Sequence, residues 1–232
     1  MKWSKITLAN FKQLEHYNNT VKDETDKLLY SVCAIYGISE HTLDTMHPKK
    51  AAKKIRAVQK VLQSEPKLIA PKFIGLHHIN YNTSSLTFGQ YVEIAYFLQE
   101  GILNNAHLIV SSCAKGFINM PHSQKAEYFL HKPIEKILGA AMQITTNFND
   151  FNKGYKGLFG VTQIDDTGKE VEVKPEPFNK QYGWIFSATQ VAEHERITLD
   201  AAFQLPVIQA LNDLAYLKSK GKYLEKQIKS MK

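Results

Sequence analysis

Apolar residues recur at intervals of three and four over most of the chain, and this period predicts amphipathic helices. A first helix is expected to begin after Thr7, whose hydroxyl suits an N-cap, and to run to about residue 19. A second is expected between Asp23, a cap residue, and Gly37, a helix stop. Pro48 suits the first position of a third helix. The predicted buried side of that helix consists of Ala51, Ile55, Val58 and Leu62.

The helical period returns in the second half of the chain. Helices are predicted after Thr87, near residues 103–115, after Pro133, around residues 182–193 and from Pro206. Their predicted buried side chains are Ile134, Ile137, Leu138, Ala141 and Met142 after Pro133, and Val207, Ile208, Leu211, Leu214, Leu217 and Leu224 after Pro206. Two segments break this period. Residues 66–84 predict an extended connector, with a short hairpin as the alternative. Alternating residues around a glycine turn in 161–173 predict a β-hairpin.

Part of the pattern occurs twice, eighty residues apart. Ile6-Thr7-Leu8 aligns with Leu86-Thr87-Phe88, and the stretch from Leu28 to Ala34 aligns with the stretch from Leu108 to Ala114. Five aligned pairs are identical, where chance gives roughly two. These are Thr7 and Thr87, Leu28 and Leu108, Ser31 and Ser111, Cys33 and Cys113, and Ala34 and Ala114. Duplicated helical units are typical of scaffolds and docking surfaces, although two unrelated amphipathic helices could share this pattern.

These patterns predict a mainly α-helical fold: a helical bundle with two pseudo-repeated helical units plus a small β-hairpin. The Ile197-Thr198-Leu199 stretch is interpreted as a recurring helix start and not as a third repeat. The predicted segments are a first helical unit (1–64), an extended connector (65–84), a second helical unit (85–147), a loop with a β-hairpin arm (148–178), and C-terminal helices with a basic tail (179–232).

Composition limits the classes of protein to which the chain can belong. Its 232 residues are 44% hydrophobic and can bury a substantial core, which excludes a disordered tail. No segment reaches the roughly 18 uncharged apolar residues of a membrane span, and the start shows no apolar signal segment. We therefore expect a protein made and used inside a cell, or carried in a particle assembled there. For Cys33 and Cys113, burial as small packing residues is favoured over a disulfide or a reactive thiol.

The net charge is +7, and the charged residues lie in separate blocks of each sign. Basic blocks could contact nucleic acid phosphates or an acidic partner, although a solvated helix face is the alternative. An acidic hairpin could reach a neighbouring subunit or be a surface ornament. The candidate contact residues are Lys49, Lys53, Arg56 and Lys60 after Pro48, and Lys218, Lys222, Lys226 and Lys229 near the C-terminus. The candidate inter-subunit hairpin carries Asp165, Asp166, Glu170 and Glu172.

Motifs for catalysis are absent from the sequence. It contains no phosphate-binding loop, dinucleotide fingerprint, nucleophile elbow or paired-histidine helix motif. His77 and His78 would point to opposite faces of an extended segment, and no carboxylate stands at metal-ligand spacing from them. Glu93 and Glu100 do not define two carboxylates facing one reacting atom. We therefore predict no enzyme activity, no catalytic residues, no metal and no cofactor.

Two stretches resemble a known group of proteins. The segment Ser85-Leu-Thr-Phe-Gly-Gln-Tyr-Val-Glu-Ile94 resembles the LT-x-G-Q-Y-x-D/E-L helix start of small proteins of tailed bacteriophages. Tyr182-Gly-Trp-Ile185, followed by Ile197-Thr-Leu and a terminal helix with Leu214-Ala-Tyr-Leu217, is similar to the end of the same proteins. They include neck and tail proteins of the crAss-like phages and tail assembly chaperones. Where that group has a W-G-W-Y aromatic cluster, this chain has Tyr-Gly-Trp-Ile.

The resemblance implies a structural virion protein that forms an oligomeric ring in the neck or tail and helps to connect portal to tail. Its expected partners are further copies of itself, other neck or tail proteins and packaged DNA. It would be made in the host bacterial cytoplasm and end in the virion. The alternatives are a tail assembly chaperone absent from the mature particle, and a basic nucleic-acid-binding protein. The resemblance implies no catalytic residues.

Overall fold

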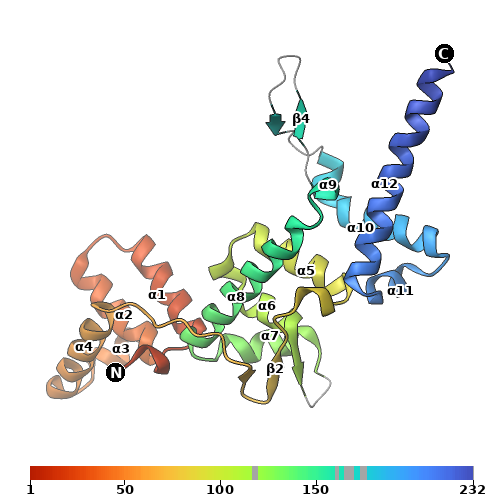
Figure 1. Cartoon of the computed structure of the whole chain (residues 1–232). Helices are drawn as coiled ribbons and strands as arrows, with labels where there is room; N and C mark the ends of the chain where they lie inside the picture. Colours follow the sequence, from red (N-terminus) through yellow and green to blue (C-terminus); the bar gives the residue numbers. More distant parts are fainter. Residues whose placement is uncertain (117–119, 160–161, 165–169, 173–176, 232) are drawn as a thin grey trace. The chain divides into compact units, whose positions relative to one another are not determined.

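The computed structural model describes residues 1–116, 120–159, 162–164, 170–172 and 177–231 (Figure 1). The described chain is mainly α-helical, as predicted, with small antiparallel sheets. It divides into two compact units. The first contains Met1–Tyr81 and Phe97–Ile144, and the second contains Asn82–Tyr96 and Thr145–Lys232.

Each unit contains several helices. The first unit holds the short 3-10 helix η1 (Trp3–Lys5), α1 (Leu8–Thr20), α2 (Glu24–Tyr36), α3 (Glu40–Asp44), α4 (Pro48–Leu62), α6 (Ile102–Cys113) and α7 (His122–Leu130). The second holds the 3-10 helix η2 (Thr83–Ser85), α9 (Lys156–Phe159), α10 (Pro177–Glu195), α11 (Leu199–Gln204) and α12 (Val207–Ser230). The division falls within α5 (Phe88–Gln99) and α8 (Ile134–Lys153).

The recurring threonines start helices in the same way. Thr7 Oγ1 accepts the amide of Asn10, and Thr87 Oγ1 accepts the amide of Gln90, each at 3.2 Å. Thr198 Oγ1 accepts the third amide of α11 at the same distance. At Thr87 the Gln90 side chain also accepts the Thr87 amide at 3.0 Å, which completes a capping box. The predicted helix starts at these three positions are confirmed.

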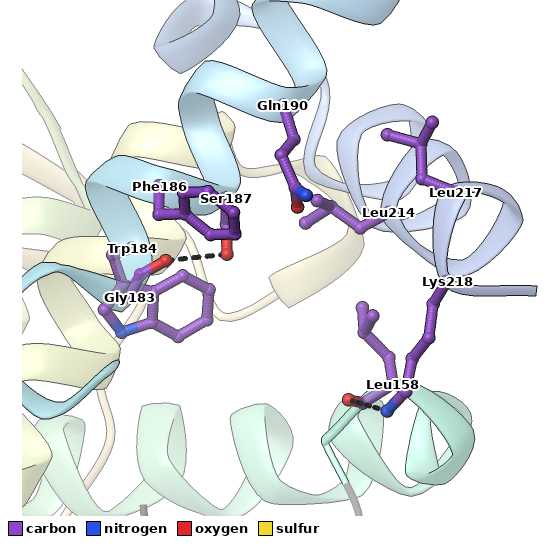
Figure 2. Close-up of a pocket in the computed structure, with 9 residues that line it drawn as sticks. All are labelled: Leu158, Gly183, Trp184, Phe186, Ser187, Gln190, Leu214, Leu217 and Lys218. Carbon is purple, nitrogen blue, oxygen red and sulfur yellow. Dashed lines mark hydrogen bonds between the residues drawn. The ribbon is translucent and has the colours of Figure 1, made fainter. Parts of the chain in front are cut away.

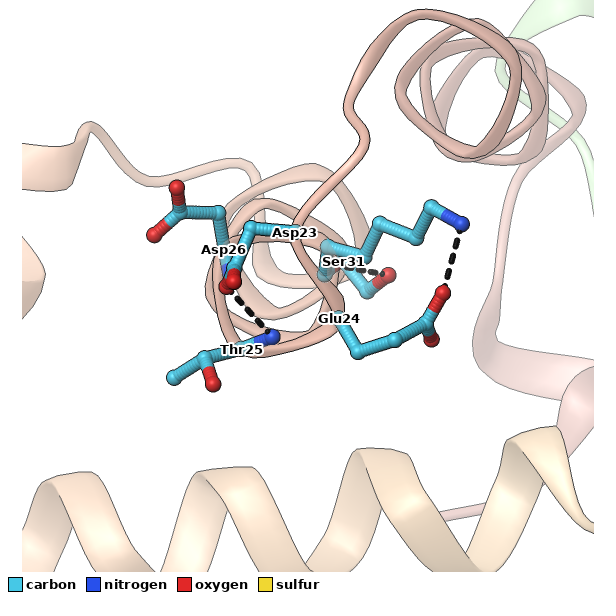
Figure 3. A network of polar contacts seen from close by, with 6 residues as sticks. Asp23, Glu24, Thr25, Asp26 and Ser31 are labelled. Carbon is cyan, nitrogen blue, oxygen red and sulfur yellow. Dashed lines mark hydrogen bonds and ion pairs between the residues drawn. The ribbon is translucent and has the colours of Figure 1, made fainter.

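Both ends of α2 (Glu24–Tyr36) also follow the prediction, and Figure 3 shows the first of them. Asp23 Oδ1 accepts the amides of Thr25 at 2.8 Å and Asp26 at 3.0 Å, which satisfies two donors of the first turn. At the other end Gly37 adopts a left-handed conformation with φ of 61°. The amide of Ile38 then donates to the carbonyl of the last turn at 3.0 Å.

In both units the threonine at the helix start also forms a backbone bridge to a proline. In the first unit Thr7 forms an antiparallel bridge with Pro133, and in the second Thr87 forms the same bridge with Pro206. Each proline precedes the first residue of a long helix, and two backbone hydrogen bonds of 2.8–3.0 Å hold each bridge. The threonines are 80 positions apart (87 − 7) and the prolines 73 (206 − 133), so one sequence offset does not describe both sides. The helix starts are therefore structurally equivalent, although the predicted contiguous repeat does not coincide with the compact units.

Helix α6 shows this difference most clearly. The repeat at an offset of eighty places it in a second helical unit, yet it lies in the same compact unit as α1 and α2. Its successor, β3 (Ala114–Gly116), pairs with β2 (His77–Ile79), which also pairs with β1 (Phe73–Ile74). The predicted connector therefore contains a short hairpin, joined by a third strand where a helix was predicted to continue. The third strand depends on its partner β2, which no local period reveals.

Each unit has its own apolar core. In the first, the largest fully buried side chains include Ile6, Leu8, Leu14, Ile109, Phe129, Ile134 and Ile137. In the second, Tyr91 stacks on Phe148 with ring centroids 4.7 Å apart and donates a hydrogen bond to Asn152 at 2.8 Å. Cys33 and Cys113 are buried and are not joined in a disulfide, as favoured by the sequence.

Several predicted core positions are wrong. Leu62 is 39% exposed because Val61 takes its place in the core at the end of α4. Met142, Ile208 and Leu224 are also exposed, since the buried arc of each helix is narrower than the apolar pattern. The predicted hairpin is confirmed: β4 (Thr162–Ile164) pairs with β5 (Glu170–Glu172), with Gln163 opposite Val171.

Candidate interaction surfaces

The first candidate surface is the solvent side of α4. His47 accepts the amide of Lys49 at the helix start and Pro48 occupies the first turn. Val58 and Val61 bury the inner side. The four predicted contact residues Lys49, Lys53, Arg56 and Lys60 are all exposed on this helix. Such a face can neutralise several phosphates or an acidic protein surface.

The second candidate surface is the C-terminal half of α12. Val207, Ala210, Leu211 and Leu214 bury the first half of this helix. From Ser219 to Met231 every residue is exposed, and Figure 1 shows this stretch extending beyond α10 and α11. The large apolar side chains here are Tyr223 (61% exposed), Leu224 (45%), Ile228 (58%) and Met231 (83%). A long helix thus presents apolar residues that its own unit does not cover.

The cations of this half are not equivalent. Lys222, Lys226 and Lys229 are exposed, as predicted for contact residues. Lys218 is instead half-buried, and its Nζ donates to the carbonyl of Leu158 at 2.9 Å. Lys218 therefore ties α12 to α9, while the other three remain on the solvent side.

A cavity of about 510 Å³ lies between α9, α10 and α12, next to the exposed half of α12 (Figure 2). Its apolar lining includes Leu214, Leu217 and Trp184, and its polar lining includes Ser187 and Gln190. The Ser187 hydroxyl is engaged, because it donates to the carbonyl of Gly183 at 2.7 Å. Among the described residues that line the cavity there is neither a His nor a carboxylate that could activate this hydroxyl.

One cluster in the described chain could hold a metal ion. His194 and Glu195 at the end of α10 and Asp213 on α12 each offer a ligand atom, all within 4.8 Å of one another. An imidazole nitrogen and two carboxylate oxygens are ligands that Zn²⁺ accepts. Asp213 Oδ2 is buried without a hydrogen bond, and burial together with Glu195 raises the pKa of Asp213. The sequence analysis missed this cluster because Asp213 is distant along the chain and on another helix.

Three other histidines, at positions 77, 122 and 131, have partners within the protein. His77 is buried against Tyr128 and Phe129, with ring centroids 5.1 and 5.3 Å away, and burial lowers its pKa. His122 hydrogen-bonds Ser112 at 3.1 Å, and His131 contacts Glu127 at 2.9 Å. In the acidic hairpin, Glu170 and Glu172 lie in β5, whereas Asp165 and Asp166 lie outside the described residues.

Comparison of the chain with protein-family models, curated proteins and solved structures found no match. Within the described residues, no helix combines the length and the apolar character needed to cross a membrane.

Proposed function

We propose that this chain is a structural protein of a tailed phage particle and forms an oligomeric ring that helps to connect portal to tail. The observation that carries the proposal is the uncovered half of α12, where exposed apolar side chains accompany three exposed lysines. Burial of such residues stabilises association with another protein by removing apolar area from water. The sequence resemblance to phage neck and tail proteins supports the proposed setting.

A closed ring requires two different surfaces on each copy, which meet in a head-to-tail contact. Candidates of opposite charge exist on this chain: the four exposed cations of α4 and the acidic residues Glu170 and Glu172 of the hairpin. The proposed mechanism is assembly. Buried helix faces stabilise each subunit, and charged or apolar outer faces join the copies.

The test is the mass of the assembled protein and its presence in particles. Native mass spectrometry of the purified full chain is expected to give one closed oligomer, and mass spectrometry of purified virions to detect the protein. A monomer at all concentrations would contradict the ring. A protein absent from virions but bound to a tail component in infected cells would instead identify a tail assembly chaperone.

The basic face of α4 favours one second candidate, a nucleic-acid-binding protein. Four phosphate contacts would give a slope of about −3.6 when log affinity for duplex DNA is plotted against log salt. The combined change of Lys49, Lys53, Arg56 and Lys60 to glutamine would flatten that slope. The same change of Lys222, Lys226 and Lys229 tests whether the second basic surface, on α12, contributes to the salt dependence. A wild-type affinity without salt dependence would exclude this candidate.

A further inference from the structure

Apolar residues or a glycine occupy every a and d position of one heptad register through both halves of α12, while Ile208, Leu211, Tyr216 and Tyr223 lie outside those positions. With positions labelled a to g, the a positions are Val207, Leu214, Gly221 and Ile228, and the d positions are Ala210, Leu217, Leu224 and Met231. Residues 207, 210 and 214 are buried in the second unit, whereas 224, 228 and 231 are exposed. Apolar side chains with this seven-residue spacing typically pack against a second helix. The second half of α12 therefore leaves an apolar seam of this period uncovered.

The exposed lysines lie where such a contact would leave them in water. Lys222 and Lys229 occupy b positions and Lys226 an f position, on the side of the helix away from the seam. The seam can thus be covered without desolvating these three charges. A ligand attracted only by charge would approach the lysines, which lie on the face opposite the seam. The seam therefore favours an apolar partner.

The residues flanking the seam distinguish between candidate partners. Position g holds Lys220 and the following e position holds Glu225, which is the single acidic residue between 214 and 231. In two parallel helices in register, a g residue lies opposite the e residue five positions later on the other helix. Lys220 of one copy would then face Glu225 of the other, twice in each pair. Both side chains are exposed in the single chain.

We propose that the C-terminal half of α12 associates in parallel and in register with the same segment of a second copy of this chain. Ile228 at an a position with Leu224 at a d position favours two strands. The exposed seam is short, but the helix is already nucleated by its buried first half, so the usual cost of helix initiation does not oppose pairing. Parallel pairing relates two copies by a two-fold axis along the helices, so it joins the copies in pairs, and the head-to-tail contacts of the proposed ring are left to the charged surfaces of α4 and the hairpin.

The inference rests on the proposed function, because it names the partner of the surface that carries it. Disulfide trapping in the full chain tests it. Leu224→Cys places a thiol in the seam, where two parallel helices bring d residues within disulfide reach, and Lys226→Cys is the matched control on the outer face. The native Cys33 and Cys113 are buried and contribute no accessible thiol. Mild oxidation is expected to convert most Leu224→Cys protein to a covalent dimer and to leave Lys226→Cys largely monomeric.

Charge exchange provides a second measurement. Lys220→Glu and Glu225→Lys each place like charges opposite one another, and each is expected to raise the dissociation constant in analytical ultracentrifugation roughly fivefold to twentyfold. The double variant restores opposite charges and is expected to return close to the wild-type value. Additive loss in the double variant would overturn the parallel register.

The outcomes separate the inference from the proposed function. Closed oligomers in native mass spectrometry without preferential trapping at position 224 would overturn the inference and leave the ring standing. A monomer without trapping would overturn both. Equal trapping at positions 224 and 226 would indicate random collision and would also overturn the inference. A wild-type chain that binds anionic vesicles or an acidic protein but does not associate with itself would overturn the inference, because self-association is what the inference predicts.

Discussion

Gly139 of α8 offers a test of how the first unit is packed. A Cβ atom at this position would lie 2.2 Å from the carbonyl oxygen of Ile69 and 2.5 Å from its amide nitrogen. The backbone of residue 69 is held there, because its amide donates to the carbonyl of Glu135, one turn earlier in α8, at 3.0 Å. The neighbouring amide of Lys67 donates to the Glu135 carboxylate at 3.2 Å. Gly139→Ala would therefore push this connector away from the helix.

The expected effect is the difference between two opposing terms. Alanine inside a helix is more favourable than glycine by about 1 kcal/mol. Against this, displacing the connector loses the Ile69–Glu135 hydrogen bond, about 1 kcal/mol, and overpacking costs about 1–3 kcal/mol. Gly139→Ala is thus expected to lower the free energy of unfolding by about 1–3 kcal/mol. For a chain of this size that corresponds to a fall in Tm of roughly 2–12 °C.

Thermal unfolding followed by circular dichroism measures this effect. Gly221→Ala is the matched control, since Gly221 also lies in a helix but a Cβ there would meet no atom within 4 Å. This control is expected to stabilise the protein by about 0.5–1 kcal/mol. If Gly139→Ala were as stable as wild type or more stable, the close approach of the connector to α8 would be refuted.

Three further predictions concern single groups. Burial, with Lys12 nearby, lowers the pKa of half-buried His107 to about 4. The unfolded chain therefore binds a proton at this residue before the folded protein does. The free energy of unfolding is expected to fall by about 1–2 kcal/mol as the pH decreases from 6.5 toward 4, after allowing for solvent screening. Urea unfolding at pH 7 and 4.5 checks this, and His107→Gln should show a smaller loss. The raised pKa of Asp213 means that its negative charge opposes folding. Asp213→Asn is therefore expected to raise Tm at pH 7 and to give no gain below about pH 3.8, where the carboxyl is protonated in both states. An unchanged Tm at pH 7 would contradict the burial argument. Thr87→Ala removes the cap of α5 and is expected to lower the free energy of unfolding in urea by about 1 kcal/mol. Thr87→Ser keeps the hydroxyl and is expected to retain most of that stability. Equal losses in the two variants would assign the effect to packing.

Local features of the fold were readable from the sequence because their partners are close along the chain. Thr7, Thr87 and Asp23 each bind amides two or three residues ahead, and Gly37 reaches a left-handed conformation that other residues avoid. Position 62 was not readable in this way. Both Val61 and Leu62 fit the apolar period of α4, and only the neighbouring helices determine which one is buried.

The candidate surfaces also have some features that the sequence determines and others that only the tertiary structure determines. The sequence by itself determined the cationic faces of α4 and α12 and the heptad period of α12, because charge and helical spacing are properties of the chain. The tertiary structure decided that Lys218 is held by the Leu158 carbonyl, that Asp213 meets His194 and Glu195, and that the seam of α12 is covered only as far as Leu214. These facts depend on which residues distant in the chain become neighbours, and a local period contains no information about that.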